Sequence, residues 1–360
     1  MSISAYGPVL EIFQKAHGVN FFSALSTCLT SDMSQLAADV LEWLLEESNP
    51  SVRFWALQQL EGKSPSSSEV QEAQASLMGT NPVKAILDAQ DSEGYWVDSE
   101  NMYLPKYRAT THSLLILAEL GAEKTSAIEK GIEHVLTFQR DSGHFLPDMP
   151  KTIQGRASIV KDGCCFDGNI LYYMIHFGYL ADSRVQRLID FMVDYHSMDS
   201  AGWRCRAYPI NPNGVFSKNC YMGAVKSLRA LARIPDKHRS EEVRRIIDRE
   251  VENILENRVF TYLRAEDGSR KDKAGWKRFG FPLFYQSDAL EVLDVLTSLG
   301  VRDDRMQEAV DLVEDARGPD GRWALKGSFN GKMWVDIEVK GKPSKWITLR
   351  ALRTLKRYYQ

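Results

Sequence analysis

The sequence predicts an all-α protein, a single (α/α)6 toroid in which inner and outer helices alternate around a common centre. Two kinds of segment lead to this prediction. Residues 183–196 and 240–257 are amphipathic, with apolar positions every three or four residues opposite a charged face. Residues 111–120, 169–180 and 289–299 are apolar nearly all round, which indicates helices buried on both sides. The two kinds alternate along the chain, as expected for outer and inner helices.

The inner helices are expected to recur at intervals of roughly 55–65 residues, which is the spacing of a repeat. Their predicted starts lie near residues 107, 165, 220, 285 and 344, and 51–61 supplies a sixth helix with 34–47 as its outer partner. Six such hairpins would close a ring, and an open solenoid is the alternative. We therefore divide the chain into an N-terminal helical extension, 1–33, and the toroid, 34–360.

The composition is that of an ordinary globular protein, with 44% hydrophobic and 26% charged residues and a net charge of −3. No apolar run approaches the roughly 20 residues of a membrane span, and the N-terminus does not resemble a secretory signal. The five cysteines are an odd number in a long chain, which favours reduced thiols. These observations predict a cytoplasmic protein without a disulfide framework, and the overall charge does not suggest nucleic-acid binding.

A short motif recurs in register with the helix pairs. The first copy, Gln90-Asp-Ser-Glu-Gly94-Tyr-Trp96, has the form Q-x-x-x-G-x-W. Degenerate copies follow at Gln139…Gly143-His-Phe145, Gly202-Trp203 and Arg317…Gly321-Arg-Trp323. We expect the glutamine to cap backbone at a helix end, the glycine to permit a turn, and the aromatic ring to pack between neighbouring hairpins.

On these motifs, residues of about 80–360 resemble squalene and other triterpene cyclases and the β subunits of protein prenyltransferases, whose shared unit is an α/α toroid. The resemblance implies the fold more strongly than the reaction. The acidic D-x-D-D motif of squalene-hopene-type cyclases is absent, and the nearest run, 335–338, is expected in an exposed loop. Those cyclases also use two barrels where this chain has one. Both differences argue against cyclisation by protonation.

The prenyltransferase comparison implies a zinc ion held partly by a D-x-C element and a histidine. Asp162-Gly163-Cys164 and His112 occupy matching places, and such enzymes also need a partner subunit. The residues independently suggest a metal site, because Cys165 and Cys220 open successive inner helices, Cys205 lies in the loop between them and His112 opens the helix before Cys165. Three thiolates and an imidazole suit tetrahedral zinc. Buried unreactive cysteines, or one reactive thiol, are the alternatives, and Cys28 is expected to be structural.

Positive charge is concentrated in the loops that lead into the inner helices. Residues 270–278 carry a net charge of +4, whereas 326–345 and 204–218 each carry +3. A basic rim around a lumen would attract an anion, and a diphosphate is what the family resemblance implies. Charged loops that serve only solubility are the alternative.

The lumen itself is expected to be aromatic and apolar. Aromatic residues near the predicted inner-helix starts are Trp55, Tyr107, Phe166, Tyr172, Tyr221, Phe284, Tyr285 and Trp346. Such a wall would suit an isoprenoid chain, although aromatic residues at helical spacing also build cores. Combining rim and lumen, the candidate substrate-binding residues are Arg108, Tyr107, Arg204, Lys345, Trp346 and Tyr285. No catalytic residue is assigned.

The sequence thus predicts a prenyltransferase-like or terpene-cyclase-like enzyme, zinc-assisted, that takes an isoprenoid diphosphate or a similar apolar anion into its lumen. A partner subunit or a homo-oligomer is compatible with this prediction. One alternative is a non-catalytic ring that binds a peptide or protein. Another is a carbohydrate-active toroid, which would need a carboxylate pair; Asp167 and Asp288 are the acids near inner-helix starts, and they lie in non-adjacent repeats.

Overall fold

The computed structural model describes residues 26–145, 164–203, 220–264 and 267–360. The described chain is mostly helical, with one small two-stranded sheet, as predicted. Its first element, α2 (Ser26–Leu44), runs across the predicted boundary between residues 33 and 34. The rest of the predicted N-terminal extension lies outside the described residues.

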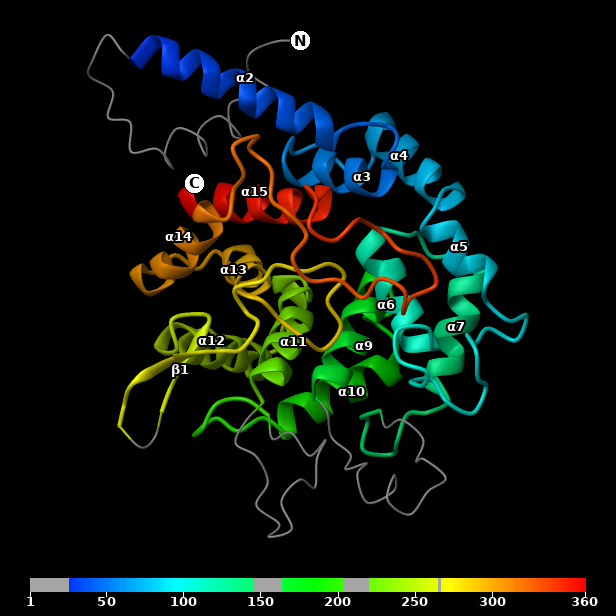
Figure 1. Cartoon of the computed structure of the whole chain (residues 1–360). Coiled ribbons are helices and arrows are strands. Elements are labelled where there is room, and N and C mark those ends of the chain that lie inside the picture. The colour runs from blue at the N-terminus through cyan, green and yellow to red at the C-terminus, as the bar shows by residue number, and fades with distance from the viewer. Residues whose placement is uncertain (1–25, 146–163, 204–219, 265–266) are drawn as a thin grey trace.

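Six helices lie side by side around a common centre (Figure 1). They are α3 (Pro50–Gln59), α6 (Thr110–Leu120), α9 (Cys164–His176), α11 (Tyr221–Ala232), α13 (Ala289–Ser298) and α15 (Lys345–Tyr359). Each packs on the next from α6 to α15, and α15 packs on α3. The indole of Trp55 in α3 donates a hydrogen bond of 3.0 Å to the Glu119 carbonyl in α6, so α3 also contacts α6. Their starts lie within a few residues of the predicted ones.

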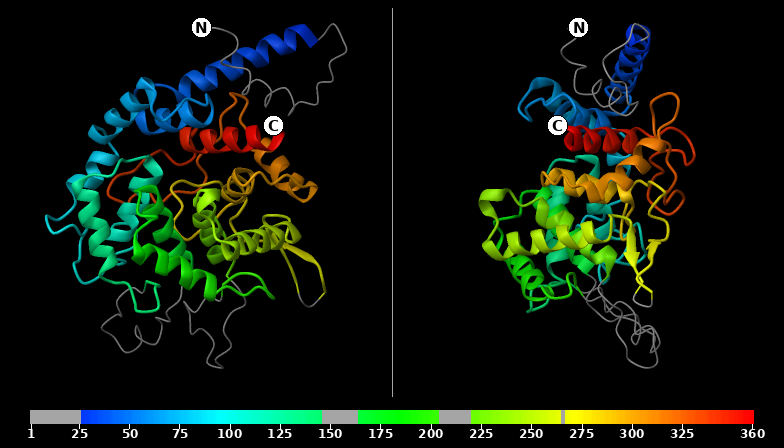
Figure 2. Two further views of the ribbon diagram at one scale, coloured as in Figure 1. Left: turned by 180° about the vertical axis from the view of Figure 1, so that it is seen from behind. Right: turned by 90° about the vertical axis from the view of Figure 1, so that its left-hand side faces the viewer.

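A second set of helices lies outside the first, as Figure 1 and the left view of Figure 2 show. It comprises α4 (Ser68–Gly79), α5 (Val83–Asp88), α7 (Ser126–Leu136), α10 (Ser183–Asp194), α12 (Glu241–Glu256) and α14 (Gln307–Asp315). In α12 the apolar side chains of Val243, Ile246 and Ile247 are buried, whereas the acidic and basic residues between them are mostly exposed. The amphipathic pattern of residues 240–257 therefore correctly predicted a helix with one buried and one exposed face.

Short elements connect the helices. The 3-10 turns η2 (Asp236–His238) and η3 (Asp304–Met306) precede α12 and α14. Strands β1 (Thr261–Leu263) and β2 (Arg270–Asp272) form an antiparallel hairpin with Tyr262 opposite Lys271. Helix starts are capped as their sequences suggest: the Ser240 hydroxyl accepts from the Val243 amide at α12, and the Ser344 hydroxyl accepts from the Ile347 amide at α15.

In its two glutamine-containing copies, the recurring motif joins one helix pair to the next. The Gln90 side-chain amide donates to the Gly94 carbonyl at 2.8 Å and to the Ala127 carbonyl, at the start of the next outer helix α7, at 2.9 Å. Gln139 does the same with Gly143 and with Arg184 at the start of α10. The glutamine therefore bridges two repeats rather than merely capping its own helix.

The motif tryptophans anchor the turns to the preceding outer helices. Their indole nitrogens donate to backbone carbonyls ten or eleven residues earlier: Trp96 to Ile86, Trp203 to Met192 and Trp323 to Val313. All three rings are fully buried. The predicted structural role of the aromatic residue is confirmed, because a buried indole must find an acceptor and the helix end provides one.

Substitution of Gly94 by alanine is expected to lower the free energy of unfolding by about 2–3 kcal/mol. Gly94 has φ +100°, and a Cβ there would lie 2.7 Å from the Lys130 backbone of α7. Gly62 is a matched control, since its φ is +69° but nothing lies within 4 Å of an added Cβ. Urea unfolding should show a clearly smaller loss, about 1 kcal/mol, for Gly62→Ala. Equal losses would mean that the close approach of α7 is unimportant.

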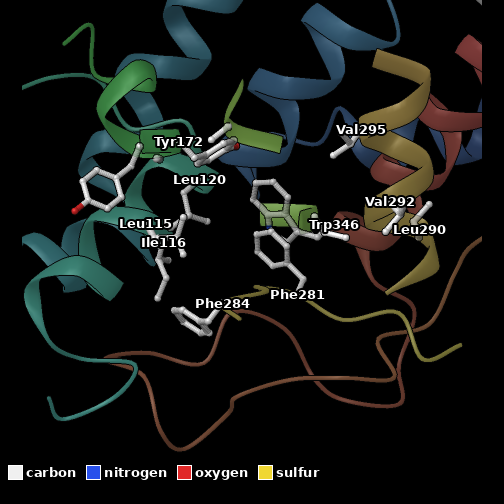
Figure 3. Close-up of a cluster of buried hydrophobic side chains, with 14 of the residues drawn as sticks. Leu115, Ile116, Leu120, Tyr172, Phe281, Phe284, Leu290, Val292, Val295 and Trp346 are labelled. Carbon is white, nitrogen blue, oxygen red and sulfur yellow. The ribbon is translucent and has the colours of Figure 1, made fainter. Parts of the chain in front are cut away.

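Buried apolar and aromatic side chains from the inner helices and from the loop before α13 form a cluster (Figure 3). Trp346 at the start of α15 stacks on Phe281, with ring centroids 4.2 Å apart and planes 7° apart. Tyr172 of α9 and Phe284 are buried in the same cluster. Among the described residues, no helix is both long enough and apolar enough to span a membrane.

Candidate functional site

A cavity of about 440 Å³ lies within the ring and is lined by side chains from all six inner helices. We call it the lumen cavity. Residues from the middle and last turns of these helices dominate its wall: Trp55, Gln59, Glu119, Tyr172, Ile175, His176, Arg229, Ala232, Arg233, Glu291, Asp294, Val295, Ser298, Trp346, Leu349, Arg350, Arg353 and Arg357. The volume is in the range of small-molecule sites.

The wall of the lumen cavity is strongly charged. It carries five guanidinium groups against three carboxylates, those of Glu119, Glu291 and Asp294, a net charge of +2. Each carboxylate meets a guanidinium: Glu119 contacts Arg229, Glu291 lies 3.3 Å from Arg229, and Asp294 accepts hydrogen bonds from Arg353 and Arg357 at 2.8 and 3.0 Å. All three acids are therefore neutralised within the wall.

A buried lysine completes this network behind the wall. The Lys226 ammonium, on α11, lies 2.5 and 2.7 Å from the two carboxylate oxygens of Glu291, and Lys226 is 1% exposed. Burial alone would raise the pKa of Glu291, but Lys226, Arg229 and Arg350 lower it below its ordinary value. Burial likewise opposes ionisation of Asp294, yet Arg353 and Arg357 hold its pKa well below the usual range. Neither acid is therefore held in the protonated form that a proton donor needs.

Arg350 and Arg233 are less closely paired with carboxylates than the other three arginines of the wall. Arg350 is 5% exposed, and its Nη1 has no hydrogen-bond partner among the described residues. Arg233 makes no ion pair within the described part of the chain; it packs over the Tyr172 ring at 4.9 Å and donates to Nδ1 of His176 at 3.3 Å. An unpaired buried donor costs free energy, so Nη1 of Arg350 indicates a place for an acceptor in the cavity that Arg233 also lines.

His176 lines the cavity in a fixed neutral form. Its Nε2 lies 2.9 Å from the Ala122 carbonyl, an acceptor, so Nε2 carries the proton and Nδ1 accepts from Arg233. Burial, together with the nearby Arg233 charge, lowers the pKa of His176 to about 4. The ring is thus uncharged near neutral pH and adds no further positive charge to the wall.

The prediction of an aromatic, apolar lumen is wrong for this half of the ring. Trp55, Tyr172 and Trp346 do line the cavity, but charged side chains from the same helices line it as well. The signal was present in the sequence, because Glu119, Glu291 and Arg350 each interrupt an otherwise apolar helix. A charge on a helix that is buried on both sides must be paired, so such residues predict a polar network.

The predicted substrate-binding residues are dispersed. Of those described, Trp346 lines the lumen cavity, whereas Arg108 donates to the Met333 carbonyl and Tyr107 stacks on Phe329. The Lys345 ammonium lies 2.7 Å from Glu46, outside the cavity, and Tyr285 hydrogen bonds to His112. Arg204 lies outside the described residues.

The predicted zinc ligands come only partly together. Helix α9 begins at Cys164, and Cys220 caps α11; a Cβ added to Gly223 would lie 3.5 Å from Cys220 and 3.7 Å from Cys164, so the two helix starts are neighbours as expected. The His112 Nε2 lies 2.5 Å from the Tyr285 hydroxyl. Burial, with Tyr103 and Cys165 nearby, raises the pKa of Tyr285.

Within the described ranges no group of three or more histidine, cysteine, aspartate or glutamate side chains is placed to hold a metal ion. Cys205, the fourth predicted ligand, lies outside these ranges. The described residues therefore do not assemble a zinc site by themselves, and the complete ligand set stays a prediction.

The remaining acids have structural roles. Asp288 accepts from the Glu291 amide at 2.8 Å and from the Gly280 amide at 2.9 Å, and burial raises its pKa to about 6. Asp167 accepts from the Phe145 amide at 2.9 Å. Glu338 was expected in an exposed loop, but it is partly buried and accepts from the Lys345 amide at the start of α15. That expectation is wrong because the loop folds back to cap a helix.

Comparisons with known proteins give distant likenesses. No family model and no curated protein matches the chain. Among solved structures, the chain is similar to an arginine-to-alanine variant of the type II terpene cyclase MstE from Scytonema in complex with geranylgeranyl dihydroxybenzoate, at 12% identity and a TM-score of 0.44 over 98% of this chain and 99% of that one. An aspartate variant of MstE matches at 13% identity and a TM-score of 0.41, over 89% and 98% of the two chains. A protein from Actinoplanes matches at 11% and 0.30, over 80% and 100%. Likenesses this distant carry no argument about the reaction.

Proposed function

We propose that this chain is a terpene-cyclase-like or prenyltransferase-like enzyme that binds an apolar ligand with an anionic group, such as an isoprenoid diphosphate, in the lumen cavity. The proposal includes a single (α/α)6 toroid as the fold that builds the cavity. The observation that carries it is the wall of the cavity, where guanidinium groups outnumber carboxylates, Nη1 of Arg350 has no hydrogen-bond partner among the described residues, and Trp55, Tyr172 and Trp346 line the same space.

The physical argument weighs two electrostatic effects. Inner-helix C-termini lie near the cavity and bring partial negative charge, which favours some of the arginines for structural reasons alone. That effect does not account for Arg350, which lies in the middle of α15 with Nη1 unpaired. An anion placed against Arg350 and Arg233 would satisfy these donors through charge-assisted hydrogen bonds. The rings of Trp55, Tyr172 and Trp346 would contact an apolar chain.

Farnesyl and geranylgeranyl diphosphate are the probes for this proposal. We expect the purified chain to bind one of them, measured by calorimetry and by a rise in Tm, and Arg233→Gln to weaken binding about tenfold or more through loss of a charge-assisted contact. Arg245→Gln is the matched control, because Arg245 is exposed on the outer helix α12. Absence of binding across both probes, or equal weakening in the two variants, would contradict the proposal. Product analysis after incubation then separates an enzyme from a ring that only binds.

Zinc assistance remains part of the proposal, resting on the neighbouring starts of α9 and α11 and on Cys205. If it is correct, elemental analysis of protein purified without added metal gives stoichiometric zinc, and Cys165→Ser, Cys205→Ser and Cys220→Ser each lose it. Binding in the lumen cavity does not depend on that outcome, since the predicted zinc ligands that the structure describes, His112, Cys165 and Cys220, do not line the cavity.

A further inference from the structure

A second cavity, of about 290 Å³, lies away from the lumen cavity at the N-terminal ends of α11 and α13. We call it the rim pocket. Two loops and the first turn of α11 build it: residues 274–287, which lead into α13, residues 326–340, which lie between α14 and α15, and Met222. It shares no lining residue with the lumen cavity.

The rim pocket is lined by three cationic side chains, Arg278, Lys326 and Lys340, and by no carboxylate among the described residues. None of the three makes an ion pair within the described ranges. Neighbouring basic residues differ in this respect: Lys277 lies 2.6 Å from Asp272, and Lys345 is paired with Glu46. All three side chains are exposed, so water solvates their charge and they are available to an anion.

A buried hydroxyl gives an independent indication of a ligand. Ser287 lines the rim pocket and is 5% exposed, and its Oγ has no hydrogen-bond partner among the described residues. A buried hydroxyl without a partner costs about 1–3 kcal/mol. The adjacent carboxylate of Asp288 is not its partner either; the Asp288 oxygens accept from the backbone amides of Glu291 and Gly280.

The backbone of the two loops gives the rim pocket a fixed shape. The Phe281 amide donates to the Gly327 carbonyl, and the Gly327 amide donates to the Phe279 carbonyl at 2.9 Å. A Cβ on Gly280 would lie 3.0 Å from the Gly327 oxygen, so the loops cross in close contact. Trp276, which is 3% exposed, forms part of the wall. A preformed shape lowers the ordering cost of binding.

We propose that the rim pocket is a phosphate-binding site, in which Arg278, Lys326 and Lys340 supply charge and the Ser287 hydroxyl donates to a phosphate oxygen. A phosphate group matches the observations because it brings negative charge and several strong acceptors to a pocket lined by three cations, by the unpartnered Ser287 hydroxyl and by no carboxylate among the described residues. Its source is either the phosphate of a ligand that also reaches the lumen or a separate phosphorylated molecule.

Pyrophosphate and inorganic phosphate are the probes, titrated by calorimetry at low ionic strength. The parent chain is expected to bind pyrophosphate, and Arg278→Gln and Lys326→Gln each weaken binding about tenfold. Lys332→Gln is the matched control, since Lys332 is exposed on the same loop but does not line the pocket. Raising the salt concentration should weaken pyrophosphate binding by the parent and reduce the difference in affinity between the parent and the variants.

Ser287→Ala tests the buried hydroxyl without changing charge. We expect about fivefold weaker pyrophosphate binding while the unliganded variant is at least as stable as the parent, because an unpaired hydroxyl has been removed. A purely structural serine would give the reverse, with lower stability and unchanged affinity.

The outcomes separate this inference from the lumen proposal, on which it does not depend. No pyrophosphate binding by the parent, or equal weakening by Lys332→Gln, overturns the rim site. Pyrophosphate binding lost in Arg233→Gln but retained in the rim variants also overturns it, since the anion then lies in the lumen cavity. If the rim variants weaken pyrophosphate and farnesyl diphosphate alike, one ligand supplies the phosphate; if they weaken pyrophosphate alone, a separate phosphorylated molecule does.

Discussion

Replacing Lys226 by methionine is expected to lower the free energy of unfolding by about 3–5 kcal/mol, the usual cost of removing one partner of a buried ion pair. The side chain is 1% exposed, and both carboxylate oxygens of Glu291 lie within 2.7 Å of its ammonium. Methionine fills similar volume, so the loss comes from the carboxylate left behind. Glu291 would keep Arg229, at 3.3 Å, as its remaining contact.

The double variant Lys226→Met/Glu291→Leu provides the control. Removing both charges leaves no uncompensated carboxylate, and urea unfolding should show a loss smaller than that of Lys226→Met alone. Lys237→Met, on the exposed turn η2, should change stability by less than about 0.5 kcal/mol. If Lys226→Met unfolds like the parent, the network does not hold α11 against α13.

The order and spacing of the helices could be predicted from the sequence because apolar periodicity reports directly on burial. The inner-helix starts at Thr110, Cys164, Tyr221, Ala289 and Lys345 follow the predicted repeat. The roles of the motif residues could also be predicted, because Gly94 has the positive φ that the turn needs and the buried indole of Trp96 donates to a nearby helix end. Helix spacing and motif roles depend on residues that are close in the sequence or one repeat away, and the repeat pattern of the sequence shows both.

The lumen could not be predicted in the same way because its character depends on which face of each inner helix points to the centre. Three charged residues, Glu119, Glu291 and Arg350, converge from three helices, and no local pattern gives that convergence. For the basic loops, the sequence shows where the charges lie in the chain but not which partners they meet. Lys345 turns to Glu46, whereas Arg278 and Lys326 meet in the rim pocket, and loop conformation decides between these outcomes.

Stability of the parent is expected to fall as the pH decreases from 7 to 4, in part because of His176. The pKa of its ring is about 4 in the folded chain and about 6.5 when unfolded, so the unfolded state binds more protons in this window. The contribution is fully present above pH 6.5 and is lost as the pH falls toward 4. Because the ring is partly exposed to the cavity, we expect about 2 kcal/mol from this group.

His176→Gln isolates that contribution, since glutamine can donate to the Ala122 carbonyl and accept from Arg233 but does not titrate. Urea unfolding at several pH values should show a smaller acid loss in the variant, by about 2 kcal/mol between pH 7 and 4. His112, with a pKa lowered to about 3, acts in the same direction, whereas Asp288, with a pKa near 6, destabilises as the pH rises through 4 to 6. Both groups are present in parent and variant, so only the difference between the two curves reports on His176. Parallel curves would show that the pKa of His176 in the folded chain is close to its value in the unfolded chain, and the ring would then be better solvated than its buried position implies.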